Sequence, residues 1–521
     1  MHILDEIVEK RKEDIKKYGY TFGVAVPEKR LRGITPFLLK KGAVLEVKRA
    51  SPSKGDIAPG LDAAKTAETY AEAGAAAISV LTEKRYFKGD LNDLMAVCRS
   101  VDSYAVRTGK IAPCVLRKDF ILCPEEIDVA YRCGADVVLL IARILDDDML
   151  LEMVKKCRTL GISALLELRL DDDLRKLALI AEKAGTDNLV CGVNSRDLST
   201  FAIDLLTPAG ILDEIRHIAG KDVRVIFESG IRTPKAAAFA GSMGFSGMLL
   251  GEAAARNPGE AAALTAAFVN AATSQNAQRW LSFAKAVRAK KHLSGGEKKP
   301  FVKICGLTSA SDALNAAECG ADFLGFIFCA KSPRNVSAET VREIKKALLE
   351  RSEQSGGQDV GSLPVLVAVI TECNSAEGRA AISLAEEGTV DIIQLHGKTA
   401  SDEFFAEEAF SSLPHYVAVN VSTEDDLDKI DELRKIGEPR ILVDAQFAGK
   451  IGGTGMQVQG SLCTAVSKKI KLWLAGGISS ENVRQIVQDY EPELIDVNSG
   501  IESAPGKKDV QKMKALFGQL Q

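Results

Sequence analysis

The chain has 521 residues, of which 46% are apolar, 26% are charged and 6% are aromatic, and its formal net charge is −4. This length predicts two to four domains, or two large barrels, with enough apolar material for sizeable cores. The nearly neutral charge and the lack of a long basic run exclude nucleic acid or an anionic membrane surface as the main partner.

The eleven cysteines and five histidines are scattered along the chain. No Cys-x-x-Cys pair and no closely spaced histidine pair occurs, which argues against a disulfide framework and against a zinc site. The N-terminal 20 residues are charged and amphipathic, without an apolar signal core. No apolar run approaches the roughly 20 residues of a membrane span. These features predict a cytoplasmic protein with free thiols.

The first half of the chain alternates between helical and strand patterns. Apolar residues at helical spacing predict a helix over residues 3–17, and a second short helix is expected near 35–41. Eight short apolar runs follow, separated by helical segments that end at glycines such as Gly74 and Gly134. Runs that are apolar throughout are typical of strands buried on both faces of a parallel sheet, and eight such units predict a (β/α)8 barrel. The expected strands cover residues 43–48, 76–81, 112–117, 136–141, 163–168, 188–194, 223–228 and 245–251.

The same pattern then repeats. An Ala-rich stretch and a basic helical stretch end in a Ser/Gly-rich segment before residue 300, which is typical of a linker. The tetrapeptide Cys-Gly-Ala-Asp occurs at the same helix-to-strand junction in both halves, at 133–136 and 319–322. A Ser/Gly/Gln-rich stretch, 351–362, is expected to form an exposed loop. The expected strands of the second half cover residues 301–305, 323–328, 365–370, 391–396, 416–421, 440–444, 472–475 and 494–498.

Together these patterns predict an α/β protein of two fused (β/α)8 TIM barrels, the first with an extra N-terminal helical cap. The predicted domains are a first barrel over residues 1–270, a helical and polar linker over 271–299, and a second barrel over 300–521. A monomer is expected, because each barrel already has a tethered partner.

Charged residues end several expected strands of the first barrel. Glu46 and Lys48 alternate with apolar residues, so they share one face of the first strand. The active site of such a barrel forms at the carboxyl ends of its strands, where Lys118, Glu167 and Glu228 also fall. Two lysines and three glutamates in one mouth shift each other's pKa values, as general acid–base catalysis requires. The alternative is that these charges only neutralise each other in the barrel centre.

Glycine turns late in the first barrel predict a phosphate site. Ser229-Gly230-Ile231 follows the seventh strand and Gly251-Glu252 follows the eighth, where barrels bring backbone N–H groups and a helix N-terminus to a phosphate. Further polar residues expected at this mouth are Ser51, Asn194 and Arg196.

Six motifs in this half resemble the indole-3-glycerol-phosphate synthase family. They are ILDEI at 3–7, EVKRASPSKG at 46–55, SVLTEKRYF at 79–87, RKDFI at 117–121, NSRDL at 194–198 and ESGI at 228–231. The resemblance covers residues 1–270. It implies that 1-(2-carboxyphenylamino)-1-deoxyribulose 5-phosphate is converted to indole-3-glycerol phosphate, CO2 and water.

The resemblance also implies roles for individual residues. Lys118 is expected to be the general acid as the ring closes, and Glu167 its carboxylate partner in proton transfer and dehydration. Lys48 is expected to hold the anthranilate carboxylate and phosphate side, and it is the alternative to Lys118 as the acid. The residues expected to orient the substrate or wall its ring are Glu46, Asn194, Arg196, Glu228, Ser229, Phe87 and Phe120.

In the second half, a thiol ends the first expected strand. Cys305 is followed by Gly306 and preceded by Lys303, a cation that is expected to lower the thiol pKa. The alternative is a small buried hydrophobic residue. Asp444 ends the sixth strand, across the barrel. A thiolate and a carboxylic acid on opposite sides of a bound sugar suit an aldose–ketose isomerisation.

Motifs in this half resemble the phosphoribosylanthranilate isomerase family over residues 300–521. They are KICGLT at 303–308, SPR at 332–334, QLHG at 394–397, GGTG at 452–455, LAGG at 474–477 and SGIESAPGKKD at 499–509. The implied reaction is the Amadori rearrangement of N-(5-phosphoribosyl)anthranilate, whose product is the substrate of the first half. Two departures are Met-Gln-Val-Gln after Gly455 and asparagine at 498, which are expected to tune substrate or phosphate contacts.

By this resemblance Cys305 is the general base, Asp444 is the general acid and Arg334 grips the anthranilate carboxylate, with His396 also binding substrate. Phosphate is expected at the late glycine turns, which contain Gly453, Thr454, Gly476, Gly477, Ser499 and Gly500. The whole chain is then a bifunctional enzyme of tryptophan biosynthesis that needs no cofactor. The alternatives are a second barrel that serves only as a degenerate partner, and a phosphosugar-binding regulatory or scaffold protein without chemistry.

Overall fold

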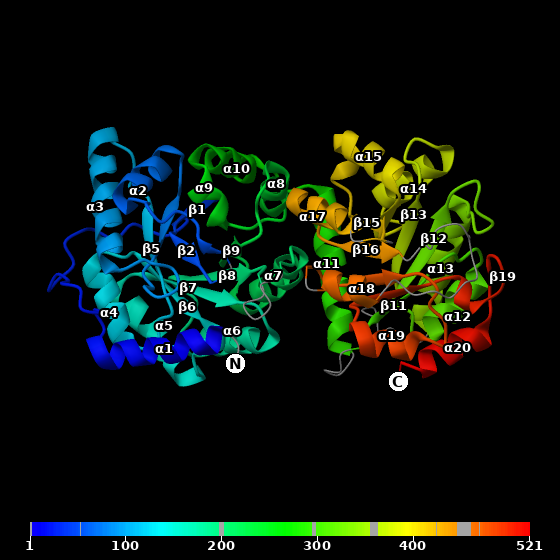
Figure 1. The fold of residues 1–521 in the computed structure, drawn as a ribbon, viewed down its shortest axis with the longest axis horizontal. Coiled ribbons are helices and arrows are strands. Elements are labelled where there is room, and N and C mark those ends of the chain that lie inside the picture. Colours follow the sequence, from blue (N-terminus) through cyan, green and yellow to red (C-terminus); the bar gives the residue numbers. More distant parts are fainter. Residues whose placement is uncertain are drawn as a thin grey trace. The chain divides into compact units, whose positions relative to one another are not determined.

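The computed structural model forms two compact units, residues 1–273 and 274–521 (Figure 1). It describes residues 3–52, 54–196, 203–293, 299–354, 363–421, 423, 425–444, 460–467 and 469–520. No helix among these residues is long and apolar enough to cross a membrane.

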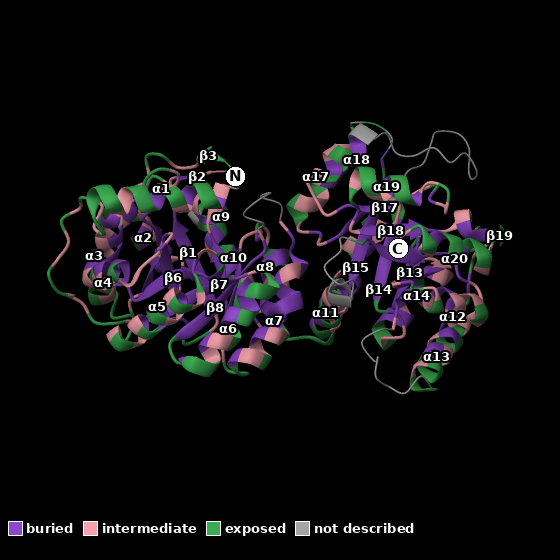
Figure 2. Ribbon diagram, turned by 90° about the horizontal axis from the view of Figure 1, so that it is seen from below, coloured by how far each residue is buried: buried purple, intermediate pink, exposed green. Residues whose placement is uncertain are grey.

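The first unit is a closed barrel of eight parallel strands in the order β1-β10-β9-β8-β7-β6-β5-β4, which confirms the predicted architecture. The strands are almost entirely buried, while the surrounding helices expose their outer faces (Figure 2). The barrel strands are β1 (Gly42–Val47), β4 (Ala77–Leu81), β5 (Cys114–Lys118), β6 (Val137–Ile141), β7 (Ser163–Leu168), β8 (Leu189–Asn194), β9 (Arg224–Glu228) and β10 (Gly247–Leu250).

Helices follow the strands in regular alternation and begin and end where local sequence signals predict. Gly134, for example, is the left-handed C-cap of the helix before β6, at φ 102°, as the sequence predicts. The first unit also contains α1 (Ile3–Tyr18), α2 (Ala63–Glu72), α3 (Leu91–Thr108), α4 (Pro124–Cys133), η1 (Ala142–Ile144), α5 (Asp147–Leu160), α6 (Asp171–Lys183), α7 (Leu206–Ala219), α8 (Pro234–Ser242), α9 (Glu252–Arg256), α10 (Pro258–Asn270) and the small hairpin β2 (Ala50–Ser51) with β3 (Gly55–Asp56).

The short helix expected near residues 35–41 is not formed, and that prediction is wrong. This stretch is a series of turns in which Phe37 and Leu38 are buried and Leu38 has a left-handed φ of 48°. Pro36 has no N–H to donate, and the left-handed Leu38 interrupts any regular hydrogen-bond ladder.

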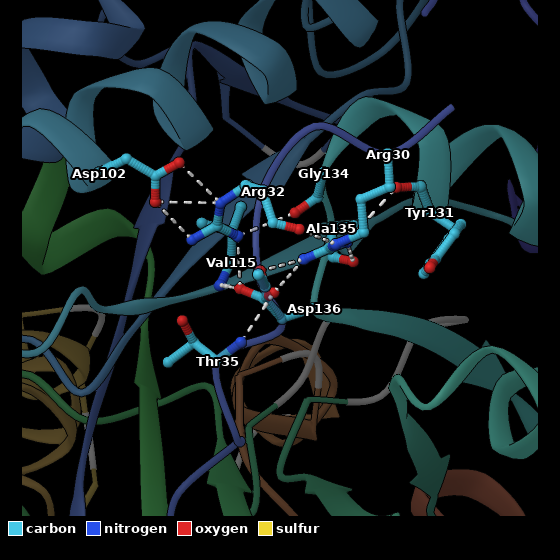
Figure 3. Close-up of polar contacts among 10 residues, drawn as sticks. Arg30, Arg32, Thr35, Asp102, Val115, Tyr131, Gly134, Ala135 and Asp136 are labelled. Atoms are coloured by element: carbon cyan, nitrogen blue, oxygen red, sulfur yellow. Dashed lines mark hydrogen bonds and ion pairs between the residues drawn. The ribbon is translucent and has the colours of Figure 1, made fainter. Parts of the chain in front are cut away.

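A buried carboxylate fastens this N-terminal segment to the end of the barrel opposite the mouth (Figure 3). Asp136, at the start of β6, accepts hydrogen bonds from Arg30 Nη2 at 2.5 Å and from Arg32 Nη1 at 2.7 Å. It also accepts from the backbone N–H groups of Thr35 at 3.1 Å and Val115 at 2.9 Å. A fully hydrogen-bonded buried charge of this kind is stable only while all its partners remain.

Replacing Asp136 by alanine is therefore expected to lower the free energy of unfolding by about 3–5 kcal/mol, because two guanidinium groups lose their buried partner. Urea unfolding of the full chain measures this. Asp102→Ala is the matched control, since Asp102 also pairs with Arg32 but its side chain is 42% exposed, and a loss within about 1 kcal/mol is expected there. Equal losses in the two variants would contradict the assignment.

The second unit is also a closed parallel barrel, in the order β11-β12-β13-β14-β15-β16-β17-β18. Its strands are β11 (Phe301–Ile304), β12 (Phe323–Phe328), β13 (Val365–Ile370), β14 (Ile392–His396), β15 (His415–Asn420), β16 (Ile441–Asp444), β17 (Trp473–Ala475) and β18 (Leu494–Val497). The other elements are α11 (Gln275–Leu293), α12 (Ala310–Glu318), α13 (Ala338–Gln354), α14 (Ala376–Glu387), α15 (Lys398–Ala406), α16 (Glu408–Ser411), α17 (Asp426–Ile436), α18 (Gly460–Ser467), α19 (Val483–Tyr490), η2 (Ser499–Ile501), β19 (Glu502–Ala504), β20 (Lys507–Lys508) and α20 (Val510–Gly518).

Two predicted segments differ from the structure. The region treated as a linker contains α11, which packs on the second barrel: Trp280 is buried, donates to the carbonyl of Ser412 at 3.1 Å and stacks edge-on against His415. Its buried aromatic face explains why it is part of the second unit. Residues 351–354 of the expected loop belong instead to α13, which continues to Gln354; residues 355–362 lie outside the described part.

Candidate active sites

The site residues predicted for the first barrel line one cavity of about 320 Å³ at the carboxyl ends of its strands. Ile3, Leu4 and Ile7 of α1 form part of its wall, so the cap helix contributes directly to the site. The predicted residues found there are Glu46, Lys48, Ser51, Phe87, Lys118, Phe120, Glu167, Asn194, Arg196, Glu228, Ser229, Gly230, Gly251 and Glu252.

Lys118, the last residue of β5, is the centre of the charge arrangement. Its Nζ lies 2.7 Å from Glu228 Oε2 and 3.7 Å from Glu167 Oε2. Burial alone lowers the pKa of Lys118, but Glu228, Glu167 and Glu46 outweigh it and raise that pKa overall. Asn194 donates to Glu167 Oε1 at 3.3 Å and fixes that carboxylate. Lys118 is therefore a protonated ammonium at neutral pH, and it lies within reach of two carboxylates that can exchange protons with it.

Burial raises the pKa of Glu228 to about 7, against the opposing effect of Lys118. Glu228 Oε1 is buried and has no hydrogen-bond partner among the described residues. This carboxyl therefore changes its protonation state near neutral pH and keeps one oxygen for a bound molecule.

Glu46 and Lys48 form a second pair, with Lys48 Nζ 2.9 Å from Glu46 Oε1. Burial opposes ionisation of Glu46, but Lys48 and Lys118 lower its pKa overall. Lys48 also lies over the ring of Phe87, at 5.6 Å from the ring centroid. Phe87 and Phe120 are in contact, with ring centroids 6.2 Å apart, and together they provide an apolar wall for a flat ring.

Another part of the cavity wall is formed by the turns after β9 and β10. Ser229 and Gly230 both have left-handed φ values, 69° and 80°, which aim backbone groups into the site. A Cβ at Gly230 would lie 2.8 Å from Ile203 and Leu205, so a glycine is required. Arg232 and Arg256, which the sequence analysis did not select, also line the cavity, and Arg256 Nη2 pairs with Glu252 at 3.0 Å.

A buried charge network behind Lys118 was also not predicted. Asp119 Oδ2 accepts from Arg11 of α1 at 2.9 Å and from Arg117 at 3.0 Å, and Glu126 Oε1 accepts from Arg11 at 2.5 Å. Asp119 Oδ1 accepts from the Phe120 N–H at 2.9 Å. The alternation Arg117-Lys118-Asp119 was the available signal, since it sends the lysine inward and its neighbours outward. The network ties the cap helix to the segment that carries Lys118 and Phe120.

In the second barrel, Cys305 directly follows β11 and is buried. Burial raises the pKa of its thiol, and this outweighs the opposing effect of Lys303. The prediction that Lys303 and the glycine turn bring the thiol pKa below its ordinary value is therefore wrong for this structure. Lys303 does lie beside the thiol, but the burial of the thiol outweighs its effect.

Asp444 ends β16 and His396 ends β14, two strands away in the sheet order. Burial raises the pKa of Asp444, and His396 acts in the opposite direction. A carboxyl that favours its protonated form is suited to donate a proton.

Arg334 forms a two-point ion pair with Glu502, at 2.6 Å for Nη2–Oε2 and 2.9 Å for Nε–Oε1. Glu502 Oε1 also accepts from buried Lys508 at 3.0 Å. Lys508 and Glu502 belong to the motif at 499–509, but the sequence analysis gave them no role. Arg334 lies against Gly306, next to the thiol, because a Cβ at Gly306 would be 2.8 Å from Arg334 Cδ.

The late glycine turns of the second barrel come together in part. Gly476 and Gly477 follow β17, while Ser499 and Gly500 follow the neighbouring β18. The two turns touch, since a Cβ at Gly500 would lie 2.2 Å from the carbonyl oxygen of Ile478. Gly453 and Thr454 lie outside the described residues.

Two barrels with buried acid–base groups at the carboxyl ends of their strands define a two-domain enzyme acting on small molecules. Family models agree: "Indole-3-glycerol phosphate synthase" matches residues 4–266 and "N-(5'phosphoribosyl)anthranilate (PRA) isomerase" matches residues 302–519. The chain belongs to these two families, one in each barrel, and is a bifunctional enzyme of tryptophan biosynthesis.

Curated relatives span both barrels. The chain is 33% identical to a multifunctional tryptophan biosynthesis protein of Schizosaccharomyces pombe over 92% of its own length, but it spans only 59% of that longer protein. It is 31% identical to the tryptophan biosynthesis protein TRP1 of Phytophthora nicotianae, with 87% of this chain and 86% of the relative covered. It is also 31% identical to TrpCF of Vibrio cholerae, with 92% and 86% covered.

Solved structures match the isomerase part. Phosphoribosyl anthranilate isomerase from Thermotoga maritima is 30% identical, and the match covers 42% of this chain and 98% of that one with a TM-score of 0.35. An isomerase in complex with reduced 1-(o-carboxyphenylamino)-1-deoxyribulose 5-phosphate is 29% identical, with the same shares covered and a TM-score of 0.34.

Proposed function

We propose that the two barrels catalyse consecutive reactions. The C-terminal barrel isomerises N-(5-phosphoribosyl)anthranilate to 1-(2-carboxyphenylamino)-1-deoxyribulose 5-phosphate. The N-terminal barrel closes that product to indole-3-glycerol phosphate with loss of CO2 and water. The observation that carries the proposal is Lys118, held at 2.7 Å from Glu228 beside an apolar ring wall in a cavity lined by the other predicted residues.

In the first barrel, Lys118 protonates the carbonyl oxygen of the substrate as the aromatic ring carbon attacks it. Loss of CO2 restores the aromatic system, and departure of water needs a second proton donor and an acceptor. Glu167 and Glu228 lie on the two sides of Lys118, so they exchange protons with it during these steps. In this proposal Lys48 and Arg196, which line the cavity, hold the anionic ends of the substrate, and Phe87 and Phe120 hold its ring.

The protonation of Glu228 gives a pH prediction. Below pH 7 the carboxyl, with its pKa of about 7, is mainly neutral and no longer holds Lys118 by charge; above pH 7 it is a carboxylate. The turnover of the synthase is therefore expected to rise with pH through about 7, and Glu228→Gln is expected to flatten this rise and lower turnover by about 10²-fold. A pH series of single-substrate turnover measures this. An unchanged pH dependence in Glu228→Gln would assign the ionisation to another group.

In the second barrel, Asp444 protonates the ring oxygen of the aminoaldose, which opens the ring to an imine. Cys305, as thiolate, then removes the proton from carbon two, and the resulting enolamine converts to the ketone. In this proposal Arg334 binds the carboxylate, and the glycine turns after β17 and β18, which touch each other, bind the phosphate. The proposal is supported by the raised pKa of Asp444, which favours the protonated acid at the start of the cycle.

We further infer a cytoplasmic location and small phosphosugar–anthranilate molecules as the ligands. All eleven cysteines are free, which supports a reducing compartment.

The experiment supplies purified protein with N-(5-phosphoribosyl)anthranilate alone and follows anthranilate-type fluorescence together with formation of indole-3-glycerol phosphate. The expected result is the indole product with a transient ribulose phosphate. If the protein turns over only the ribulose phosphate, the second barrel is a partner without chemistry. If neither compound reacts while both bind, the chain is a phosphosugar-binding protein.

A further inference from the structure

The interior of the second barrel contains a buried ion pair that the proposed reaction does not use. Lys303 of β11 is fully buried, and its Nζ lies 2.6 Å from Asp496 Oδ2 of β18. The sheet register places Lys303 opposite Asp496, Asp496 opposite Ala475, and Ala475 opposite Asp444. Residues opposite each other on neighbouring parallel strands point to the same face. The pair and Asp444 therefore form one row across four adjacent strands, inside the barrel.

The ammonium group of Lys303 has two hydrogen-bond acceptors among the described residues. Besides Asp496, it donates to Gln394 Oε1 of β14 at 2.9 Å, across the barrel interior. Gln394 Oε1 also accepts from Tyr416 at 2.7 Å, which holds the amide in place. The thiol of Cys305 also faces this ammonium, which lowers the thiol pKa. An ammonium has three N–H groups, so two are committed to Asp496 and Gln394 and one remains for a thiolate.

Cys305 lies two residues beyond Lys303 and so on the same face of the chain. Gly325 of β12 confirms how close the two side chains are. A Cβ at this glycine would lie 2.8 Å from Cys305 Sγ and 3.1 Å from Lys303 Cε, so both pack against the same bare backbone. Any larger residue at 325 would separate the ammonium from the thiol.

Asp496 lies on the Asp444 side of the pair, in the same row of residues. One of its oxygens accepts from Lys303, while Oδ1 is buried without a hydrogen-bond partner among the described residues. Only the methyl group of Ala475 stands between Asp496 and Asp444 in the row. An unneutralised carboxylate oxygen this close makes a second negative charge on Asp444 unfavourable.

We propose that Lys303 and Asp496 are a positioning pair shared by the two catalytic residues of the isomerase. Lys303 donates an N–H to Cys305 and stabilises its thiolate, while Asp496 keeps Asp444 protonated. The two catalytic groups are thereby held in opposite protonation states, which is what removal of a proton from carbon two and protonation of the ring oxygen require. This inference rests on the proposed isomerisation and adds two residues to it.

The electrostatic surroundings agree with this division. For Cys305, burial raises the thiol pKa, and Lys303 lowers it more strongly than Lys508 does, while Asp496 raises it. Arg334 also faces the thiol. For Asp444, burial raises the pKa, His396 lowers it, and Asp496 raises it more than Lys303 lowers it. Each catalytic group therefore responds chiefly to the member of the pair that lies nearer to it.

The test replaces both members with apolar residues, Lys303→Met/Asp496→Leu, because removal of a whole buried pair is tolerated better than removal of one partner. The isomerase profile of kcat/KM against pH is expected to narrow from both sides. Its acid limb moves up by about one pH unit or more, since the thiolate loses a charged donor. Its alkaline limb moves down, since Asp444 loses the neighbouring carboxylate. The kcat falls about tenfold or more with little change in KM.

The ionisation of the Cys305 thiol can also be measured independently of turnover, from the rate of its alkylation by iodoacetamide at a series of pH values, followed by peptide mass spectrometry. The pH at which this rate is half-maximal, the alkylation midpoint, is expected to rise in the double variant. Synthase turnover by the same molecules is expected to stay unchanged, because Lys303 and Asp496 lie in the other unit. Arg440→Met/Glu493→Leu is the matched control. This pair, 3.1 Å apart, lies at the amino ends of β16 and β18, away from the catalytic residues. Its replacement is expected to move neither limb of the pH profile nor the alkylation midpoint.

An unchanged pH profile and an unchanged alkylation midpoint in Lys303→Met/Asp496→Leu would overturn the proposal and leave the pair a purely structural one. Should that variant not fold, Asp496→Asn keeps the size and an oxygen for Lys303; a lower alkaline limb supports the proposal and an unmoved one overturns it. Absence of isomerase turnover in the unmodified protein overturns the proposed function instead, while the alkylation midpoints still decide whether Lys303 stabilises the thiolate.

Discussion

Lys118→Met is expected to lower the synthase turnover by about 10²- to 10⁴-fold, the range for loss of a general acid. The methionine keeps most of the side-chain volume, so the cavity and its aromatic wall remain. Glu228 and Glu167 lose the cation that lies between them, and no proton donor remains at the substrate carbonyl. Turnover of purified ribulose phosphate measures the effect, and KM is expected to change much less than kcat.

The matched control is Lys176→Met. Lys176 is also buried, and it donates to the carbonyl groups of Ala142 and Leu145 at 2.9 and 2.7 Å. It does not line the cavity, so its replacement is expected to change stability and not turnover.

Lys48→Met separates the two candidates for the acid. Lys48 pairs with Glu46 at the cavity wall, and its loss is expected to raise KM more than it lowers kcat. The reverse pattern, with Lys118→Met changing KM and Lys48→Met abolishing turnover, would make Lys48 the acid.

The fold was predictable because both barrels depend on local signals. Short runs of apolar residues mark strands buried on both faces, and glycines such as Gly134 end the helices between them at a left-handed φ. The predicted helix near 35–41 failed for the opposite reason. Its apolar residues suit a helix, but Phe37 and Leu38 are buried by contacts with residues far away in the sequence, and such contacts override local preference.

The candidate sites were predictable to the extent that barrel topology fixes which residues meet. Lys118, Glu167 and Glu228 end strands, and closed parallel strands bring their carboxyl ends to one mouth. The topology does not predict which charged side chains form ion pairs with each other. Lys303 was expected to act on Cys305 alone, yet its strongest contact is with Asp496, 193 residues away. The degree of burial, which reverses the expected direction of the thiol pKa, also depends on packing that no local pattern records.

Cys305→Ala is expected to lower isomerase turnover by about 10²- to 10⁴-fold, because the alanine leaves no thiolate beside Lys303 to take the proton from carbon two. Asp444→Asn is expected to cause a comparable loss, since an amide cannot give a proton to the ring oxygen. Both variants are expected to keep full synthase activity on ribulose phosphate, because Cys305 and Asp444 lie in the second unit.

Cys329→Ala is the control for the thiol. Cys329 follows β12, is half-buried, and its backbone N–H bonds Asn335, so its removal is expected to leave both reactions unchanged. When N-(5-phosphoribosyl)anthranilate is supplied to Cys305→Ala or Asp444→Asn, neither the ribulose phosphate nor the indole product should form. Addition of active isomerase in trans should then restore the indole product. If Cys305→Ala keeps its isomerase turnover while Asp444→Asn loses it, the base is another residue and the thiol is only part of the core.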